Sequence, residues 1–462
     1  MAQTQITLAL RSFPPFEEPG QKPTSRNARP TQVRVDNPRY NQGDVKFLRN
    51  VFVLWLWSSA AAFSQSAPTF SQDDPAATPK TILIAPFENL SNAPGIEWIG
   101  ESFPEVMGQR LGSNSWQLLR RGERLNAFDR AGIPPGRHPS RATIFRVAEQ
   151  LDVDFVVLGS YNFDGHTFIA TCQWLDVKRA HLSKEMKESG PLPQLIDLQT
   201  ALAWDLLRLN NPALIASRDT FVSAAPPIRL DALENYTRGV LALSSADKIK
   251  YFREAVRINP SYTEALLGLG QADFEAKQYE PAAAALAKVS PTQAVGGQAQ
   301  FLLGLCEFYL GKFDKAEAAF SELTARVPLP EVYNNLGVAQ ARRGRPAAGD
   351  QFQRANDTDP GDSDYSFNLA VALYRKGDSA GATRAVRETL AANPGDAEAR
   401  SLMESLVAAS DPKFAATATP PKMPLERIKR NYDEDAFRQI AAQLQRTLAA
   451  KLAEKAQRLP KP

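Results

Sequence analysis

Small and bulky apolar residues recur along residues 263–395 with a regular period. A small residue that follows a leucine stands at four positions separated by 34, 33 and 33 residues; a second small residue comes about twelve positions later, and a bulky apolar residue about four after that. The three sets are Gly270, Gly304, Gly337 and Ala370; Ala282, Ala316, Ala348 and Ala382; and Leu286, Phe320, Phe352 and Val386. Because antiparallel helices approach closely only where one carries a small side chain, the pattern predicts helical hairpins.

One such hairpin cannot bury its own apolar face, so at least three must stack against one another. Prolines at 291, 328, 360 and 394 follow the expected second helices, and proline ends a helix because it has no backbone N–H. We expect about five hairpins over residues 231–409, the first of them degenerate and the last followed by a capping helix at residues 397–409. Together they would form an all-α solenoid.

Two stretches of this region, YNNLG at residues 333–337 and FLLGLCEFYLGKFDKAEAAF at residues 301–320, resemble the tetratricopeptide repeat. The resemblance covers residues 231–409 and implies that the first helix of each hairpin lines a concave groove. By the family pattern, the groove-facing residues are Asn334, Asn335, Arg342, Asn368, Tyr374 and Arg375.

Asparagine can pair with a peptide backbone through both groups of its amide, and arginine can fork a carboxylate. Asn335 with Arg342, and Asn368 with Arg375, repeat one seven-residue spacing in adjacent hairpins. This spacing favours a polar strip that binds an extended or helical peptide. The alternative is that asparagine is simply common in this repeat and that the arginines are solvated.

Residues 80–210 have a different pattern, in which short β-branched runs alternate with amphipathic stretches. We expect a Ser102–Glu105 capping box at the start of one helix, a second helix capped by Ser140, and a hairpin turn at Asp164-Gly165. Strands are expected at residues 81–87, 116–119, 153–161, 167–177 and 180–186, and a closing helix at residues 192–209. This order predicts an α/β (or α+β) sandwich domain in which helices pack on an antiparallel or mixed sheet, so the whole chain is multidomain.

Three blocks of residues 80–210, ILIAPFENLS, GIEWIGESFPEVM and LDVDFVVLGSYNFDG, occur in an order that is similar to the TolB amino-terminal-like domain, akin to FlgO-like and CsgG-like envelope domains. Members of that family are mostly bacterial and often precede tetratricopeptide repeats. The resemblance therefore implies a cell-envelope setting, and it implies no catalytic residues.

The amino terminus carries a localisation signal. Lys46 and Arg49 precede an uncharged apolar run at residues 51–63 and small residues at 64–67, which is the layout of a signal peptide; residues 46–67 are therefore a cleaved signal or a retained anchor. Residues 1–45 are a disordered arm or follow from a start site placed too early. Residues 68–79 and 410–432 are expected linkers. Residues 433–459 are an expected amphipathic helix that docks on the end of the repeat stack or, alternatively, binds a partner helix or a second copy of the chain.

Composition and motifs argue against several kinds of functional site. The net charge of +3 on 462 residues argues against nucleic-acid binding. The three histidines and the two cysteines, Cys172 and Cys306, lie at no metal-ligand spacing, and no phosphate loop or nucleophile motif is present. We therefore expect no catalytic, metal or cofactor site. The arginine-rich stretch from Arg120 to Arg146 is a solvated surface, or faces an acidic partner or a membrane.

These patterns predict a non-enzymatic protein–protein interaction scaffold of the bacterial cell envelope. It would be periplasmic or otherwise exported, and it would bind a protein or peptide in the groove. The alternative is a membrane-tethered or cytoplasmic regulatory adaptor that is anchored in the inner membrane through residues 46–63. The sequence does not indicate an oligomeric state.

Overall fold

The structure, a computed structural model, describes residues 80–112, 116–133, 139–210, 216–225, 227–410 and 425–434. The signal or anchor at residues 46–67, the arm before it and most of the helix expected at residues 433–459 lie outside these residues. None of the described helices is both long enough and apolar enough to cross a membrane.

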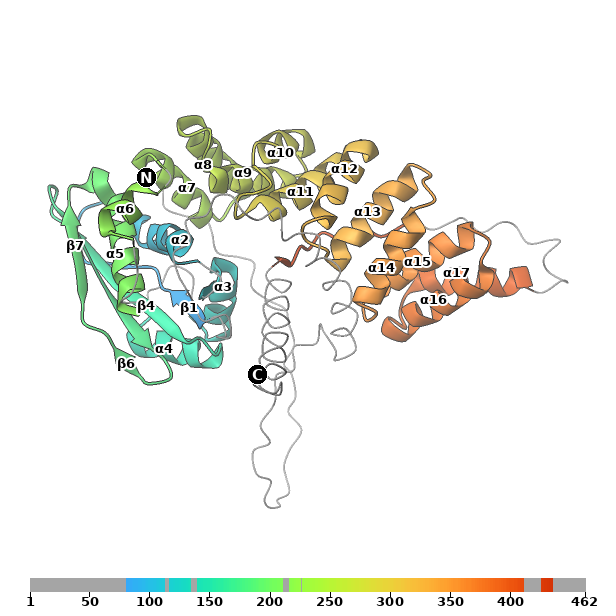
Figure 1. Cartoon of the computed structure of the whole chain (residues 1–462), viewed down its shortest axis with the longest axis horizontal. Coiled ribbons are helices and arrows are strands. Elements are labelled where there is room, and N and C mark those ends of the chain that lie inside the picture. The colour runs from blue at the N-terminus through green and yellow to red at the C-terminus, as the bar shows by residue number, and fades with distance from the viewer. Residues whose placement is uncertain are drawn as a thin grey trace, which may run out of the picture. The chain divides into compact units, whose positions relative to one another are not determined.

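The first described part of the chain forms a mixed sheet of seven strands, where the sequence predicted five strands in an antiparallel or mixed sheet (Figure 1). β4 lies at its centre, parallel to β1 and antiparallel to β5, and the β4–β5 turn holds Gly165 at a φ of 97°. The strands are β1 (Lys80–Ile84), β2 (Glu88–Asn89), β3 (Trp116–Leu118), β4 (Phe155–Phe163), β5 (Phe168–Asp176), β6 (His181–Leu182) and β7 (Met186–Gly190).

Helices cover both faces of this sheet (Figure 1). Because side chains alternate along a strand, Ile82 and Ile84 of β1 join a core with α2 (Ile99–Leu111) and α5 (Leu195–Asn210), whereas Leu83 joins a second core with α4 (Arg141–Gln150). Ser140 caps α4 by accepting a hydrogen bond from the Thr143 N–H, as expected.

Two local expectations are wrong. α2 begins at Ile99 rather than at Ser102, because the Ser102 hydroxyl is buried, donates to the Ile99 carbonyl at 2.7 Å and accepts from Gln199 at 2.7 Å. The strand expected at residues 180–186 is two short strands, β6 and β7. The Ser183 hydroxyl accepts from the Trp174 N–H at 2.9 Å and so replaces a backbone partner there.

Eleven helices between residues 230 and 410 form the repeat region as five hairpins and a capping helix. They are α7 (Leu230–Leu241), α8 (Ser245–Ile258), α9 (Thr263–Glu275), α10 (Tyr279–Leu286), α11 (Gly296–Tyr309), α12 (Phe313–Thr324), α13 (Pro330–Arg342), α14 (Ala348–Thr358), α15 (Ser363–Arg375), α16 (Ser379–Ala392) and α17 (Ala397–Ser410).

The expected steric pairing holds within the hairpins. A Cβ placed on Gly304 of α11 would lie 2.6 Å from the Phe320 ring of α12, and a Cβ on Gly337 of α13 would lie 2.7 Å from the Phe352 ring of α14. Ala316, the second small position of the α11–α12 hairpin, is fully buried. Small residues therefore make room for the bulky side chain of the next helix, and buried apolar clusters extend across neighbouring hairpins.

Candidate functional site

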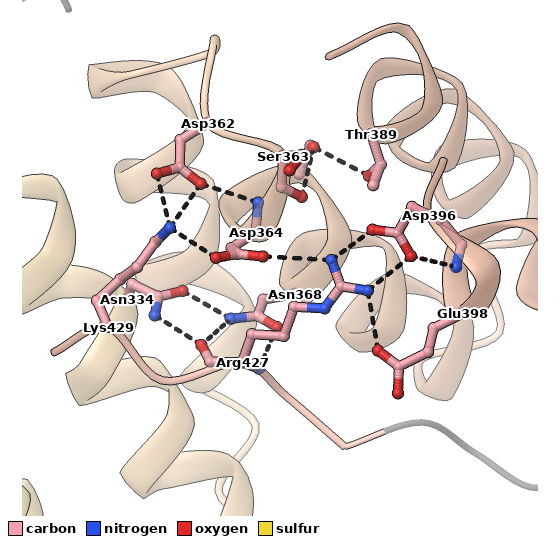
Figure 2. Close-up of polar contacts among 12 residues, drawn as sticks. Asn334, Asp362, Ser363, Asp364, Asn368, Thr389, Asp396, Glu398, Arg427 and Lys429 are labelled. Atoms are coloured by element: carbon pink, nitrogen blue, oxygen red, sulfur yellow. Dashed lines mark hydrogen bonds and ion pairs between the residues drawn. The ribbon is translucent and has the colours of Figure 1, made fainter. Parts of the chain in front are cut away.

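Residues 425–434 of the chain, here called the tail segment, lie in extended conformation against α11, α13 and α15. Almost all of this segment is neither helix nor strand, and its polar partners come from the first helices of successive hairpins and from α17 (Figure 2). The sequence predicted only a linker for residues 410–432. The structure differs, because residues 425–432 are engaged by the groove.

Two asparagines each pair with one residue of the tail backbone through both groups of their amide. Asn368 donates to the Arg427 carbonyl and accepts from the Arg427 N–H, both at 2.7 Å. One hairpin earlier, Asn335 makes the same pair of bonds with Lys429, both at 2.8 Å. The spacing of two residues between Arg427 and Lys429 matches an extended strand, in which every second residue presents its N–H and C=O to the same side.

Asn334 completes the amide network. Its amide nitrogen donates to the Arg427 carbonyl at 2.9 Å, and its oxygen accepts from Asn368 at 2.7 Å (Figure 2). Asn334, Asn335 and Asn368 are all fully buried. A buried amide without partners is destabilising, so the three side chains need a peptide backbone, or water in its place, along the groove.

The carboxylate of Glu426 lies between Arg342 and Arg375. It is 3.5 Å from Arg342, hydrogen-bonds to Arg375, and Glu426 is only 6% exposed. Both arginines stand at the carboxyl ends of their helices, where a cation is also favoured by the helix dipole. The two arginines thus form a basic pocket for one acidic side chain.

The Arg427 side chain enters an acidic pocket on the other side of the groove. Its guanidinium pairs with Asp396 at 2.6 and 2.8 Å, with Glu398 at 2.9 Å and with Asp364 at 3.2 Å, and it lies 3.7 Å from the centre of the Phe367 ring. Burial alone would lower the pKa of Arg427, but the hydrogen bonds to Asp396 and Glu398 outweigh it and raise that pKa. The same contact with Arg427 lowers the pKa of Asp396.

Lys429 occupies the neighbouring part of this acidic pocket. Its ammonium is 2.7 Å from Asp362 and 2.6 Å from Asp364, and it lies 5.1 Å from the centre of the Tyr365 ring. Burial lowers the pKa of Lys429, but both aspartates raise it by more. Asp362 is also the N-cap of α15, so a residue that starts the helix shapes the groove as well.

The far end of the tail segment meets aromatic residues of α11. Tyr432 stacks on Phe301 with 5.0 Å between ring centres, and Arg430 donates to the Tyr309 hydroxyl at 2.9 Å. The Asp433 N–H donates to the Glu331 carboxylate at 2.9 Å. Burial raises the pKa of Glu331 to about 7, and this hydrogen bond partly opposes the effect.

Five of the six groove residues predicted from the sequence therefore contact the tail segment. The sixth, Tyr374, is half-buried against the apolar cluster of α15 and α16 and makes no polar contact with the tail among the described residues. Sequence reasoning missed the acidic pocket and its occupant. The signal was complementary charge: acidic residues at the starts of α15 and α17 and the run ERIKR at residues 426–430.

The sheet region holds a separate buried ion pair. Arg124, which the sequence analysis grouped with a solvated or partner-facing basic stretch, is 2% exposed; it hydrogen-bonds to the Glu101 carboxylate and donates to the Ile84 carbonyl at 3.1 Å. For Arg124 that prediction is wrong, because its helix, α3 (Arg121–Arg130), turns this side chain toward α2. Within the part of the chain that the structure describes, no group of three or more acidic, histidine or cysteine side chains could hold a metal ion.

Comparison with known proteins defines the class of the repeat region. Family models described as "Tetratricopeptide repeat" match residues 245–300, 301–363 and 347–397. Residues 245–397 are therefore tetratricopeptide repeats, in agreement with the repeat pattern of the sequence. No curated protein sequence matches the chain.

Several solved structures are similar to part of the chain. "MamA 41-end from Desulfovibrio magneticus RS-1" is 19% identical, with 37% of this chain and 99% of that chain covered and a TM-score of 0.35. "Crystal structure of YrrB: a TPR protein with an unusual peptide-binding site" is 19% identical over 43% and 97%, with a TM-score of 0.34. "Functional Characterization of Pseudomonas Aeruginosa pilF" is 18% identical over 40% and 84%, with a TM-score of 0.33.

Proposed function

We propose that this protein is a non-enzymatic scaffold of the bacterial cell envelope that binds an extended peptide segment of a partner protein in the groove of its repeats. The observation that carries the proposal is the pair of two-bond contacts from Asn335 and Asn368 to alternate residues of an extended backbone. Backbone contacts of this kind are available to any extended peptide, and the flanking charged pockets then select the sequence.

The burial of the groove side chains supports binding rather than a solvated polar surface. Glu426, Asn334, Asn335 and Asn368 are buried when the groove is filled. Truncating a group that pairs with buried polar atoms leaves those atoms unsatisfied, which costs about 1–3 kcal/mol for each one. The asparagines thus discriminate between an extended backbone and a smooth helical surface, whose N–H and C=O groups are already paired internally.

The envelope setting rests on the amino-terminal half of the chain. The layout of residues 46–67 favours export, and the similarity of residues 80–210 to the TolB amino-terminal-like domain favours a second contact with an envelope component. Sequencing the amino terminus of the mature protein tests the export step. A new end at residues 65–68 supports export, and an intact chain in the membrane fraction supports the tethered adaptor instead.

Photo-crosslinking from inside the groove tests the binding step. A photoreactive phenylalanine analogue at Tyr309, which contacts the tail segment, is compared with the same analogue at Tyr251 on α8. We expect an envelope partner to be captured from position 309 and lost when Asn335 and Asn368 are both changed to alanine. Identical captures from the two positions, or capture that ignores the asparagines, would contradict a peptide-binding groove.

A further inference from the structure

We propose that the tail segment is a built-in competitor for the groove, and that the outside partner carries the same charge pattern, Glu-Arg-x-Lys, in extended conformation and binds by displacing it. This inference rests on the proposed function and adds two things to it: the chemistry of the partner and the means by which access to the groove is regulated.

Pockets of opposite charge on the two sides of the groove bind the charged side chains of this pattern. The acidic residue enters the basic pocket formed by Arg342 and Arg375, which are at the carboxyl ends of α13 and α15. The two cations enter the acidic pocket at the starts of α15 and α17, which Asp362, Asp364 and Asp396 form. A peptide with the charges reversed would place like charges in both pockets.

The positions of the two asparagines and of the charged pockets fix the direction of the bound peptide and the order of its charged residues. Asn368 holds the backbone of Arg427 and Asn335 that of Lys429, so the chain runs from α15 toward α13 as its numbering rises. Glu426, one residue before Arg427, then reaches the arginines, and Ile428 packs against the apolar clusters between the two cations. A peptide in the opposite direction could keep backbone bonds but would exchange the positions of its charges.

Covalent linkage makes the tail segment a strong competitor. Residues 411–424 join the end of α17 to the segment. A segment joined to its site by a short covalent link has an effective concentration on the order of 1 mM. A free peptide with the same contacts must therefore exceed roughly that concentration, or make further contacts, before it fills half of the grooves.

The experiment weakens the tail in the full-length chain and leaves the groove unchanged. The variant is Arg427→Glu/Lys429→Glu, and the probe is a fluorescently labelled synthetic peptide with the sequence of residues 423–434, MPLERIKRNYDE. The matched control is Arg384→Glu/Arg387→Glu, which reverses two charges on the exposed face of α16. Fluorescence anisotropy gives the affinity, and circular dichroism confirms that each protein is folded.

We expect the peptide to bind the tail variant at least 100-fold more tightly than it binds the wild type or the α16 control. A peptide carrying the same two glutamates should not bind. Adding Asn335→Ala/Asn368→Ala to the tail variant should abolish binding. Glu426→Ala, a milder change to the tail, should increase binding in the same direction and provides a second variant if the charge reversal disturbs folding.

Other outcomes distinguish a failure of the proposed competition by the tail segment from a failure of the proposed peptide-binding function. Equal binding to the wild type and the tail variant would overturn competition by the tail and leave the groove function standing. If the peptide does not bind a folded tail variant, the proposal that the partner carries the Glu-Arg-x-Lys pattern is wrong. The peptide-binding function of the groove is then tested separately by the crosslinking from position 309. A wild-type dimer in light scattering that the tail substitutions convert to a monomer would assign the tail to the groove of a second copy and overturn the intrachain arrangement.

Discussion

Asn368 and the backbone of Arg427 exchange two hydrogen bonds of 2.7 Å across a separation of 59 residues. The contact involves no side-chain atom of Arg427, and the asparagine that makes it is fully buried. The Asn368 side chain therefore fixes the position of an extended peptide backbone. Asn335, one hairpin earlier, makes the same contact with Lys429.

Asn368→Asp should release the tail segment, because aspartate is the same size but cannot donate to the Arg427 carbonyl. A buried carboxylate would then face that carbonyl, at a cost of about 2–4 kcal/mol to docking. Trypsin, which cleaves after arginine and lysine, should cut at residues 427–430 at least tenfold faster. Asn393→Asp, on an exposed residue at the end of α16, is the control and should leave the cleavage rate unchanged.

Gly304→Ala should destabilise the repeat region by about 1–3 kcal/mol, because the new methyl group would overlap the Phe320 ring and force it to move. Gly349→Ala is the matched control: Gly349 is also helical, but its nearest neighbour would lie 3.9 Å from the added Cβ, so the change should be neutral or stabilising. Urea denaturation measures both. Equal midpoints for the two variants would contradict the steric account of the hairpins.

Because of Glu331, the free energy of unfolding should decrease as the pH rises from 5 to 8. Its pKa is raised to about 7 by burial, above the ordinary 4.5, so the folded state binds the proton more tightly than the unfolded state does. The stabilisation is complete below pH 4.5 and is lost as the pH rises through 7. Glu331→Gln stays neutral and keeps an acceptor for the Asp433 N–H. Its stability relative to wild type should rise by roughly 3 kcal/mol across this range, and a constant difference in urea denaturation would refute the assignment.

Arg124→Met should cost about 3–5 kcal/mol, because it leaves the Glu101 carboxylate buried without its main partner. Arg121→Met removes a more exposed partner of the same carboxylate and should cost less than about 1 kcal/mol. Thermal denaturation of the two variants compares them directly. A loss of similar size in both would contradict the role of Arg124 as the main partner of the buried Glu101 carboxylate.

The repeat region could be predicted from the sequence because its determinants are local and periodic. Gly304 and Phe320 are only 16 positions apart, and the same steric pair recurs in the next hairpin at Gly337 and Phe352. The groove residues followed from the resemblance to the tetratricopeptide repeat, which implies that the first helix of each hairpin faces the groove. Five of the six contact the tail segment, and their role in binding a partner stays a prediction.

The occupant of the groove could not be predicted in this way. Asn335 and Lys429 are 94 residues apart, and nothing periodic links a short ERIKR run to a particular pair of helices. Ser102 shows the same limit on a smaller scale. Its spacing to Glu105 fits a capping box, but its hydroxyl is bonded by Gln199, 97 residues away, inside the first turn of α2.

Hydrogen exchange at single-residue resolution in the full-length wild type tests the central claim, which is that the groove holds an extended backbone through its asparagines. The N–H groups of Arg427 and Lys429 donate to buried amide oxygens, so they should exchange at least 100-fold more slowly than an unstructured peptide, and Asn335→Ala/Asn368→Ala should abolish the protection. Unprotected amides at both positions in the wild type would contradict the account.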